Sequence, residues 1–509
     1  MTTLTRRHVL GLTAAGVGGL AVSAAASSPA LAAAGPGSDF VAKDDDLHLL
    51  RRATFGPTQD SVKKIRSLGR REWLERQLHP NRVNDKKCDA LIRERFHRVN
   101  WTIPEARKGL DAFSWDLMYE VSMATIARSV WSERQLFEVM CEFWSNHLNV
   151  TNPSDRVWDN RHDYDRTVIR KHALGRFEDM LIASATHPAM LLYLNNADST
   201  KYNPNENYGR ELLELHTVSV DGGYNEQDMR NSALLMTGFG LNWDKGTFRY
   251  TASEHYRGPV SIMGFSDPNP DANGYKVGLR YLKYLANHPQ TAQHLAHKLC
   301  VRFVADQPDD ALVSRLAQTY LRNGTDIVPV LRQLFLSDEF ASSVGQKTRR
   351  PFEDLAATLR VLDYGPDKNG KDGIQALVWI SDSLGQQPLA WSPPDGFPDE
   401  AASWQSAGGT LSRWNTHLSL AGHWWPSSLT QPALRKLLPA KLPKTHGDLV
   451  DVLAKRLVFR KLSAPHKAAV LAFLERADSD PVTSDSAAVN WRLAYVVALI
   501  LDTPYFWVR

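Results

Sequence analysis

The sequence predicts an all-α protein: one large multi-helical unit, divided at most into two closely packed lobes, with no more than a short β-hairpin. Three observations support this fold class. Apolar residues recur at helical spacing through most of the chain after residue 47. No segment repeats the alternation of a sheet protein. Two segments rich in Pro, Gly and Asp, 266–275 and 392–399, interrupt the series as connections between helices do.

The helices follow from this spacing in order along the chain. In the first, Val62, Ile65 and Leu68 fall on one face. Asn225 begins another helix, and Asp228 completes a capping box with it. A short hairpin is expected within 250–264, and a lobe boundary near residue 290. The main predicted helices are 61–77, 105–148, 167–194, 205–220, 288–306, 310–323, 327–336, 352–362, 446–474 and 488–501.

The first 32 residues have the pattern of a twin-arginine export signal. Arg6 and Arg7 precede an apolar run, 11–26, that carries no charge, and Ala30-Leu31-Ala32 offers a small-x-small cleavage site. Residues 33–46 form a linker, Gly/Pro/Ala-rich and then acidic, before the domain that begins at residue 47. We expect a secreted or extracytoplasmic protein, with an uncleaved lipid-proximal anchor as the alternative. No other long apolar run predicts a membrane span.

Composition limits the class of partner. The formal charge is +4, and two of these charges, Arg6 and Arg7, belong to the signal. A nearly neutral surface argues against nucleic-acid binding, which needs a basic face. Cys88, Cys141 and Cys300 are too widely spaced for a CxxC motif, so we expect three buried thiols, with one disulfide as the alternative.

Several words of the sequence resemble a known family, domain of unknown function 1800. The resemblance spans nearly all of the chain after the signal, in order. It implies a secreted bacterial protein of helical fold and implies no activity. The matching words are His48–Pro57, Phe143–His147, Pro188–Leu194, Asn205–Thr217, Met236–Phe239 and Pro393–Pro398.

The helix over 205–220 carries a polar stripe, formed by Glu206, Asn207, Arg210, Glu211 and Glu214. The stripe has two interpretations. Because Glu206, Arg210 and Glu214 follow one another at i,i+4 steps, they would form a solvated ion-pair ladder. Alternatively, the stripe is one wall of a catalytic cleft.

Glycoside cleavage is the chemistry that such a cleft would support, since it needs one protonated and one ionised carboxyl group. Arg210 would keep a neighbouring Glu ionised, while Glu206 or Glu211 would be protonated. Glu142 or Asp198 would supply a second carboxylate from elsewhere in the chain. The predicted catalytic residues are Glu206, Arg210, Glu211, Glu214 and Glu142.

A divalent metal is the alternative cofactor. Glu211 and Glu214 with His147, His216 or Glu142 would suit a transition metal, and the oxygen-rich segment 195–206, which includes Asp198, would suit calcium. Helical geometry counts against part of this set, because His216 points away from Glu214. His147 and His216 lie on the apolar sides of their helices, so we expect both to be buried.

Fifteen tryptophans suggest sugar stacking as well as core packing. Trp243, Trp391 and Trp404 fall in predicted loops and are the substrate-binding candidates. We expect the core to hold Trp115, Trp131, Trp144 and Trp491.

No serine-hydrolase, zinc-protease or nucleotide-binding motif appears in its required context. The favoured function is a hydrolase or lyase acting on an extracellular polysaccharide by carboxylate acid/base chemistry. The alternatives are a non-catalytic binding or assembly protein of the envelope and a metal-dependent enzyme with Glu and His ligands.

Overall fold

Side-chain caps fix where several helices begin. The computed structural model describes residues 39–271 and 273–509, so the predicted signal and residues 33–38 of the linker lie outside the described residues. Thr58 and Thr102 form capping boxes at the starts of α2 (Gln59–Leu68) and α5 (Ile103–Gly109). The box predicted for Asn225 and Asp228 is confirmed at the start of α12 (Glu226–Leu235).

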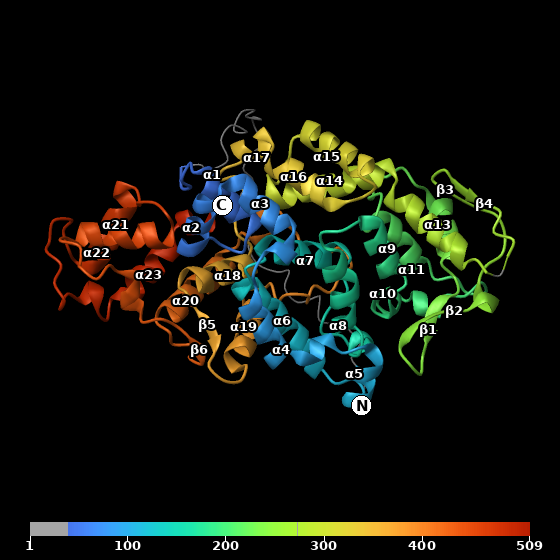
Figure 1. Ribbon diagram of the computed structural model, residues 1–509, viewed down its shortest axis with the longest axis horizontal. Helices are drawn as coiled ribbons and strands as arrows, with labels where there is room; N and C mark the ends of the chain where they lie inside the picture. The colour runs from blue at the N-terminus through green and yellow to red at the C-terminus, as the bar shows by residue number, and fades with distance from the viewer. Residues whose placement is uncertain (1–38, 272) are drawn as a thin grey trace, which may run out of the picture. The chain divides into compact units, whose positions relative to one another are not determined.

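Helices dominate the described residues, which confirms the predicted fold class (Figure 1). A π-helical turn, Asp165–Arg170, follows α8. The helices before residue 200 are, besides α2 and α5, α1 (Asp45–Ala53), α3 (Arg70–Leu78), α4 (Lys86–Arg95), α6 (Asp116–Trp131), α7 (Gln135–His147), α8 (Arg161–Tyr164), α9 (Phe177–Ala185) and α10 (Pro188–Tyr193). The later helices, besides α12, are α11 (Glu206–Glu214), α13 (Tyr275–Ala286), α14 (Pro289–Phe303), α15 (Asp310–Arg322), α16 (Ile327–Phe335), α17 (Asp338–Ser342), α18 (Pro351–Val361), α19 (Asp372–Ser383), α20 (Ala407–Ala421), α21 (His446–Leu457), α22 (Ala464–Leu474), α23 (Leu493–Leu501) and α24 (Pro504–Trp507).

Some predicted helices were too long. The segment 61–77 divides into α2 and α3 at Gly69, whose φ of +82° interrupts the helix. The segment 105–148 divides into α5, α6 and α7. The apolar spacing continues across these breaks, because the successive helices bury their faces in the same core.

The single hairpin expected within 250–264 is wrong in its bounds. Phe239–Asn242 (β1) pairs with Thr247–Tyr250 (β2), and Val260–Ile262 (β3) pairs with Phe265–Asp267 (β4). Positive φ angles at Met263 and Gly264 make the tight turn between β3 and β4. The other sheet of the described residues pairs Gly365–Asp367 (β5) with Leu429–Thr430 (β6), and all three sheets are antiparallel and two-stranded.

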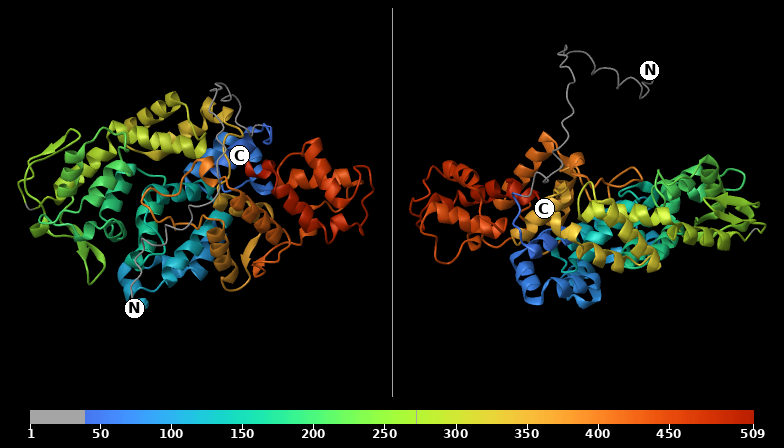
Figure 2. Two further views of the ribbon diagram at one scale, coloured as in Figure 1. Left: turned by 180° about the vertical axis from the view of Figure 1, so that it is seen from behind. Right: turned by 90° about the horizontal axis from the view of Figure 1, so that it is seen from above.

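The helices pack closely along several shared faces. Helices α14, α15 and α16 lie side by side, and α21, α22 and α23 form another group that stays together in all three views (Figures 1 and 2). Gly209 allows α11 to meet α12, since a Cβ there would lie 2.6 Å from the backbone nitrogen of Ala233. Residues 39–509 belong to one compact unit, in which residue 290 falls in the first turn of α14.

Buried groups complete the interior. Cys88, Cys141 and Cys300 are free and buried, as expected.

Within the described ranges, none of the helices combines the length and apolar character that a membrane crossing requires.

A buried histidine joins three elements at the C-terminal side of the core. His417 of α20 is 3% exposed and lies 2.8 Å from both Asp354 of α18 and Asp502 after α23. Burial alone would lower the pKa of His417, but the two carboxylates outweigh it and raise the pKa to about 9. The protonated imidazole therefore links α18, α20 and α23.

We expect stability to depend on pH through His417. Its pKa is raised above the unfolded value near 6.5, so its stabilisation is fully present below about pH 6.5 and is lost as pH rises through about 9. The loss amounts to about 3 kcal/mol. Urea unfolding of the wild type at pH 6, 7.5 and 9 measures this slope. His417→Gln should remove it, and an equal slope in the variant would contradict the role of this residue.

Candidate functional site

Helix α11 is anchored at its start to the end of α10. The side chain of Asn205 caps the helix by accepting a hydrogen bond from the backbone N–H of Asn207. The amide groups of Asn205 and Asn207 donate to the carbonyls of Asn195 and Leu194, at 3.1 and 3.3 Å. These bonds fix the rotation of α11, so that its polar stripe faces away from the core.

The polar stripe is not the ladder that its spacing predicts. Arg210 pairs with Glu214, as predicted, but its second partner at 3.5 Å is Glu226 of α12. Among the described ion pairs none joins Arg210 to Glu206, which is exposed and borders a separate hollow beside Arg230. Arg210 is 35% exposed and thus lies at the edge of the interior.

The environment of Glu211 favours its protonated form. Burial raises the pKa of the half-buried Glu211, the charge of Glu214 raises it further, Arg210 opposes them, and the charge of Asp395 adds a smaller raising effect. Asp395 is therefore a carboxylate acting on Glu211 that sequence analysis did not name, since it sought the second carboxylate in Glu142 or Asp198.

The loop that carries Asp395 is held by a set of directed hydrogen bonds. The indole N–H of Trp391 donates to Asp395 Oδ1 at 2.7 Å. Asn149 donates to the carbonyls of Trp391 and Pro393, at 2.9 and 2.7 Å. Tyr193 of α10 donates to the carbonyl of Ser392 at 2.7 Å. Asp395 is thus positioned from α10 and from the chain that follows α7.

The same loop lies directly on the end of α7. Gly396 has a φ of +76°, and a Cβ there would lie 2.2 Å from the carbonyl oxygen of Asn146, so no larger residue fits. Beyond it, Phe397 packs between the rings of Trp391 and Trp404, with centroids 5.0 and 5.9 Å away. Two of the three tryptophan candidates are therefore brought together next to Asp395.

Trp243, the third tryptophan candidate, is placed elsewhere. It lies on the turn between β1 and β2 and is 57% exposed. Its carbonyl accepts from Arg107, whose guanidinium also pairs with Asp159. Trp243 shares no ring contact with Trp391 or Trp404 among the described residues.

Tyr193 carries a hydroxyl whose proton is retained. Burial raises its pKa to about 12, and the charges of Asp395 and Glu211 add to the effect, although a hydrogen bond with Asn149 opposes it. Tyr193 therefore keeps at neutral pH the proton that it donates to the carbonyl of Ser392.

The partly buried Lys298 of α14 acts by its charge on three histidines. Burial lowers the pKa of Lys298 on α14, while Asp399 and Asp395 oppose this shift. Burial, with the charge of Lys298, lowers the pKa of His216 to about 3 and that of His294 to about 4. Burial, and then the charge of Lys298, likewise hold the pKa of His147 well below its usual range. All three histidines are therefore neutral at pH 7.

The predicted burial of the two histidines is confirmed, at 1% exposure each. His147 Nε2 lies 3.1 Å from the carbonyl oxygen of His216, and the rings of His147 and His294 are 5.8 Å apart. The pair meets through ring and backbone, in the interior behind Asp395.

The predicted metal ligands do not assemble. Asp198 is 59% exposed and lies 3.8 Å from Arg156. In the part of the chain that the structure describes, no three His, Cys, Asp or Glu side chains are grouped closely enough to hold a metal ion. The geometry of His147, His216 and Asp198 therefore does not support the metal-dependent mechanism.

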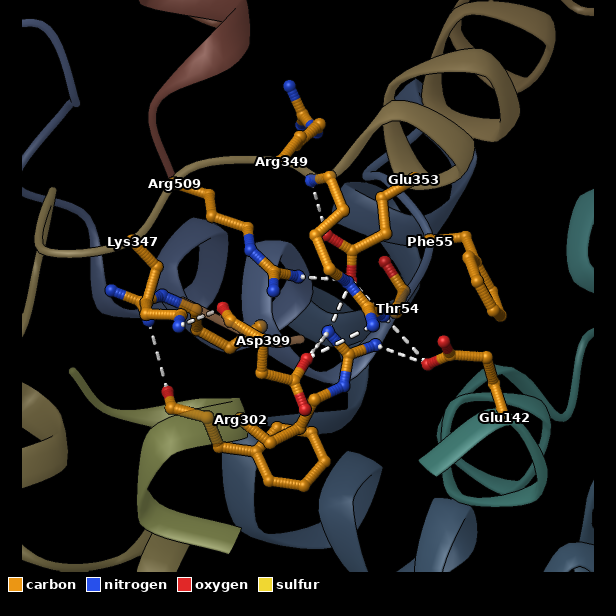
Figure 3. A network of polar contacts seen from close by, with 12 residues as sticks. Thr54, Phe55, Glu142, Arg302, Lys347, Arg349, Glu353, Asp399 and Arg509 are labelled. Atoms are coloured by element: carbon orange, nitrogen blue, oxygen red, sulfur yellow. Dashed lines mark hydrogen bonds and ion pairs between the residues drawn. The ribbon is translucent and has the colours of Figure 1, made fainter. Parts of the chain in front are cut away.

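Glu142 belongs to a buried ion cluster instead of the α11 stripe. Its carboxylate lies 2.7 Å from Arg350 and 3.2 Å from Arg302, and accepts a hydrogen bond from Asn146 (Figure 3). The charge of Glu142 is thus fully used in binding two arginines.

Glu353 is the centre of this cluster. It is 2% exposed, pairs with Arg302, and lies 3.2 Å from both Arg350 and Arg509 (Figure 3). Four elements distant in sequence, α7, α14, α18 and the segment after α24, therefore meet at buried charges.

Asp399 connects the cluster to the site. Its carboxylate lies 3.1 Å from Arg350 and 3.6 Å from Arg302, and its carbonyl accepts a hydrogen bond from Lys347 at 2.8 Å. Because Asp399 is only four residues after Asp395, the cluster fixes the far end of the loop that carries Asp395.

Comparison with known families decides the relationship of this chain. The family model described as protein of unknown function (DUF1800) matches residues 48–508. The chain belongs to the DUF1800 family. A search of curated proteins and a search of solved structures each found no match. The predicted resemblance is confirmed, and activity has to be inferred from the geometry of the chain itself.

Sequence reasoning missed several residues of this DUF1800 site. Asp395 and Tyr193 lie within words that resemble the family, and that position was the only signal for them. Lys298 and His294 lie at i,i+4 spacing on α14, beside the apolar residues of that helix. Nothing in the sequence indicated that these two side chains belong to a site.

The ion cluster of this DUF1800 protein should be essential to stability. Glu353→Gln leaves three buried guanidinium groups without a full counter-charge, so the free energy of unfolding should fall by about 3–5 kcal/mol. Glu339→Gln is the control, because its pair with Arg315 is partly exposed and should contribute less than about 1 kcal/mol. Denaturant titration compares the two variants, and equal small losses would show that the cluster contributes little.

Proposed function

We propose that this DUF1800 protein is an exported hydrolase that cleaves a carbohydrate polymer, with Glu211 as general acid and Asp395 as general base. The observation that carries the proposal is the raised pKa of Glu211, which burial raises most and to which the charges of Glu214 and Asp395 add. A carboxyl group that keeps its proton above the usual range is suited to act as the general acid of glycoside cleavage.

The reaction assigns one proton transfer to each carboxyl group. Glu211 donates its proton to the glycosidic oxygen as the bond from that oxygen to the anomeric carbon breaks. Asp395 takes a proton from a water molecule, whose oxygen bonds to the same carbon. Protons then return from Asp395 to Glu211 through solvent, so the net change is hydrolysis.

The surrounding side chains suit a sugar substrate. The partly exposed rings of Trp391 and Trp404, which pack on the buried Phe397, provide apolar faces next to Asp395. Tyr193 keeps its hydroxyl proton and donates it to the carbonyl of Ser392, which holds the loop that carries Asp395 in place for a substrate. Binding and proton transfer would therefore share one loop.

A second candidate, binding to the cell envelope, is favoured by an exposed aromatic surface on the α21–α23 side. Trp491, which sequence analysis placed in the core, is 65% exposed, and Trp424 is 55% exposed. Both line one hollow with Tyr495, whose ring lies 6.2 Å from that of the exposed Phe473. Trp115 is likewise 45% exposed rather than buried, but Trp144 is buried as predicted.

Export by the twin-arginine route is part of the proposal and is supported by residues 1–32 of the sequence. Replacing both Arg6 and Arg7 by lysine should leave the protein in the cytoplasm with its signal uncleaved. Cell fractionation and the mass of the purified chain measure this, and normal secretion of the double variant would defeat the assignment.

The catalytic assignment predicts that Glu211→Gln and Asp395→Asn each abolish hydrolysis, on the order of a thousandfold or more, because each removes a proton-transfer group. Release of reducing ends from a panel of soluble polysaccharides is the assay, and the thermal midpoint is followed as a folding check. Glu206→Gln is the matched control on the same helix. Unsaturated sugars among the products would show that the reaction is that of a lyase and not a hydrolysis. Equal activity of all three variants would contradict the proposal.

The neighbours of Glu211 should move the pH profile in opposite directions. Glu211 must be protonated to act as acid, so kcat/KM falls as pH rises through its raised pKa. Glu214→Gln removes a charge that raises this pKa and should shift the alkaline limb to lower pH. Arg210→Gln removes a charge that lowers it and should shift the limb to higher pH. Shifts of the same sign would identify another group as the acid.

A further inference from the structure

Two buried guanidinium groups lie outside both the ion cluster and the proposed catalytic site. Arg349, just before α18, is 4% exposed, and Arg413 of α20 is 5% exposed. Trp507 of α24 connects them: its carbonyl and indole N–H bond the backbone of Arg349, and its ring lies 5.0 Å from the guanidinium carbon of Arg413. Arg349 itself lies over Phe506 at 4.5 Å.

Neither guanidinium has an acceptor. Nη1 of Arg349 and both Nη atoms of Arg413 are buried and make no hydrogen bond among the described residues. Figure 3 shows Arg349 directed away from Glu353 and Asp399. Contact with an aromatic face stabilises the cation but leaves its in-plane N–H donors unused.

The nearest carboxylates are already committed to other groups. Asp354 accepts from His417 at 2.8 Å. Glu353 is shared by Arg302, Arg350 and Arg509. The charges of these two carboxylates therefore act on Arg349 and Arg413, but among the described residues neither carboxylate accepts a hydrogen bond from them.

The two cations also repel each other. Burial lowers the pKa of Arg349, the charges of Asp354 and Glu353 oppose this shift, and the charge of Arg413 adds to it. Arg51 adds a third buried guanidinium, whose Nη1 is unpaired and whose pKa is lowered by burial and then by the charge of Arg349. Unpaired buried charges destabilise a protein unless an opposite charge and hydrogen bonds compensate them.

We infer that Arg349 and Arg413 form a binding site for a small oxyanion of the phosphate or sulfate type. A tetrahedral oxyanion presents acceptors in several directions, and each guanidinium fork offers paired N–H donors that match two of its oxygens. Such an ion would satisfy the three unpaired Nη atoms and remove the repulsion. The site is independent of Glu211 and Asp395, and so of the proposed hydrolysis.

An anion bound at this site would affect the loop that carries Asp395 through the residue next to Arg349. Arg350 follows Arg349 directly and holds both Asp399 and Glu142. An anion that fixes Arg349 would therefore also steady the anchor of the loop that bears Asp395.

The test is binding of inorganic phosphate to the purified full-length protein. Equilibrium dialysis with labelled phosphate should give saturable binding of about one ion per chain, and the thermal midpoint should rise with phosphate beyond a chloride control of equal ionic strength. Arg413→Gln and Arg349→Gln should each weaken binding by about tenfold or more, since a charge-assisted bond is lost. Arg230→Gln, at an exposed arginine, should bind as the wild type does.

A competition experiment with sulfate tests which oxyanions the site accepts. If the site takes either ion, sulfate should displace the labelled phosphate. If one variant fails to fold, the other still decides the question. Absence of saturable binding in the wild type, or equal binding by the wild type and both variants, would overturn the site.

Discussion

The burial of Glu353 among three arginines is the constraint on which the rest of the molecule depends. Arg302, Arg350 and Arg509 come from distant segments, and two of them also hold Glu142 and Asp399. A buried carboxylate cannot give up such partners without a large loss of free energy. The relative placement of α7, α14, α18 and the loop after residue 391 is therefore fixed by charge as well as by packing. That arrangement also sets the position of Asp395, although Asp395 makes none of these ion pairs.

The fold class followed from sequence because its signal is local. Apolar residues at helical spacing report which faces are buried, and the burial of His147 and His216 was predicted in this way. Caps are local too, as Asn225 and Asp228 illustrate. Helix ends are a matter of single dihedral angles, and nothing in the apolar spacing marks the φ of +82° at Gly69. The misplaced hairpin has the same cause, since the turn at Met263 and Gly264 is set by backbone angles.

The site was only partly predictable because its pairings are tertiary. The stripe on α11 was evident, but its partners were not: Arg210 pairs with Glu226, and Asp395 adds its charge to the burial and the Glu214 charge that raise the pKa of Glu211. The resemblance to the family indicated which segments matter without indicating which of them face one another. Trp491 was assigned to the core, although its side chain is on the surface, because sequence does not show which face of the chain a neighbouring element covers.

The ion cluster also sets the order of events when the chain is made. Glu142 and Arg302 leave the ribosome long before Arg509, whose side chain completes the coordination of Glu353. Closing such distant contacts costs chain entropy that is repaid only when every partner is present. The loop bearing Asp395 can therefore reach its final geometry only after Arg509 has been made, and the charges that Arg509 completes stay in water until then.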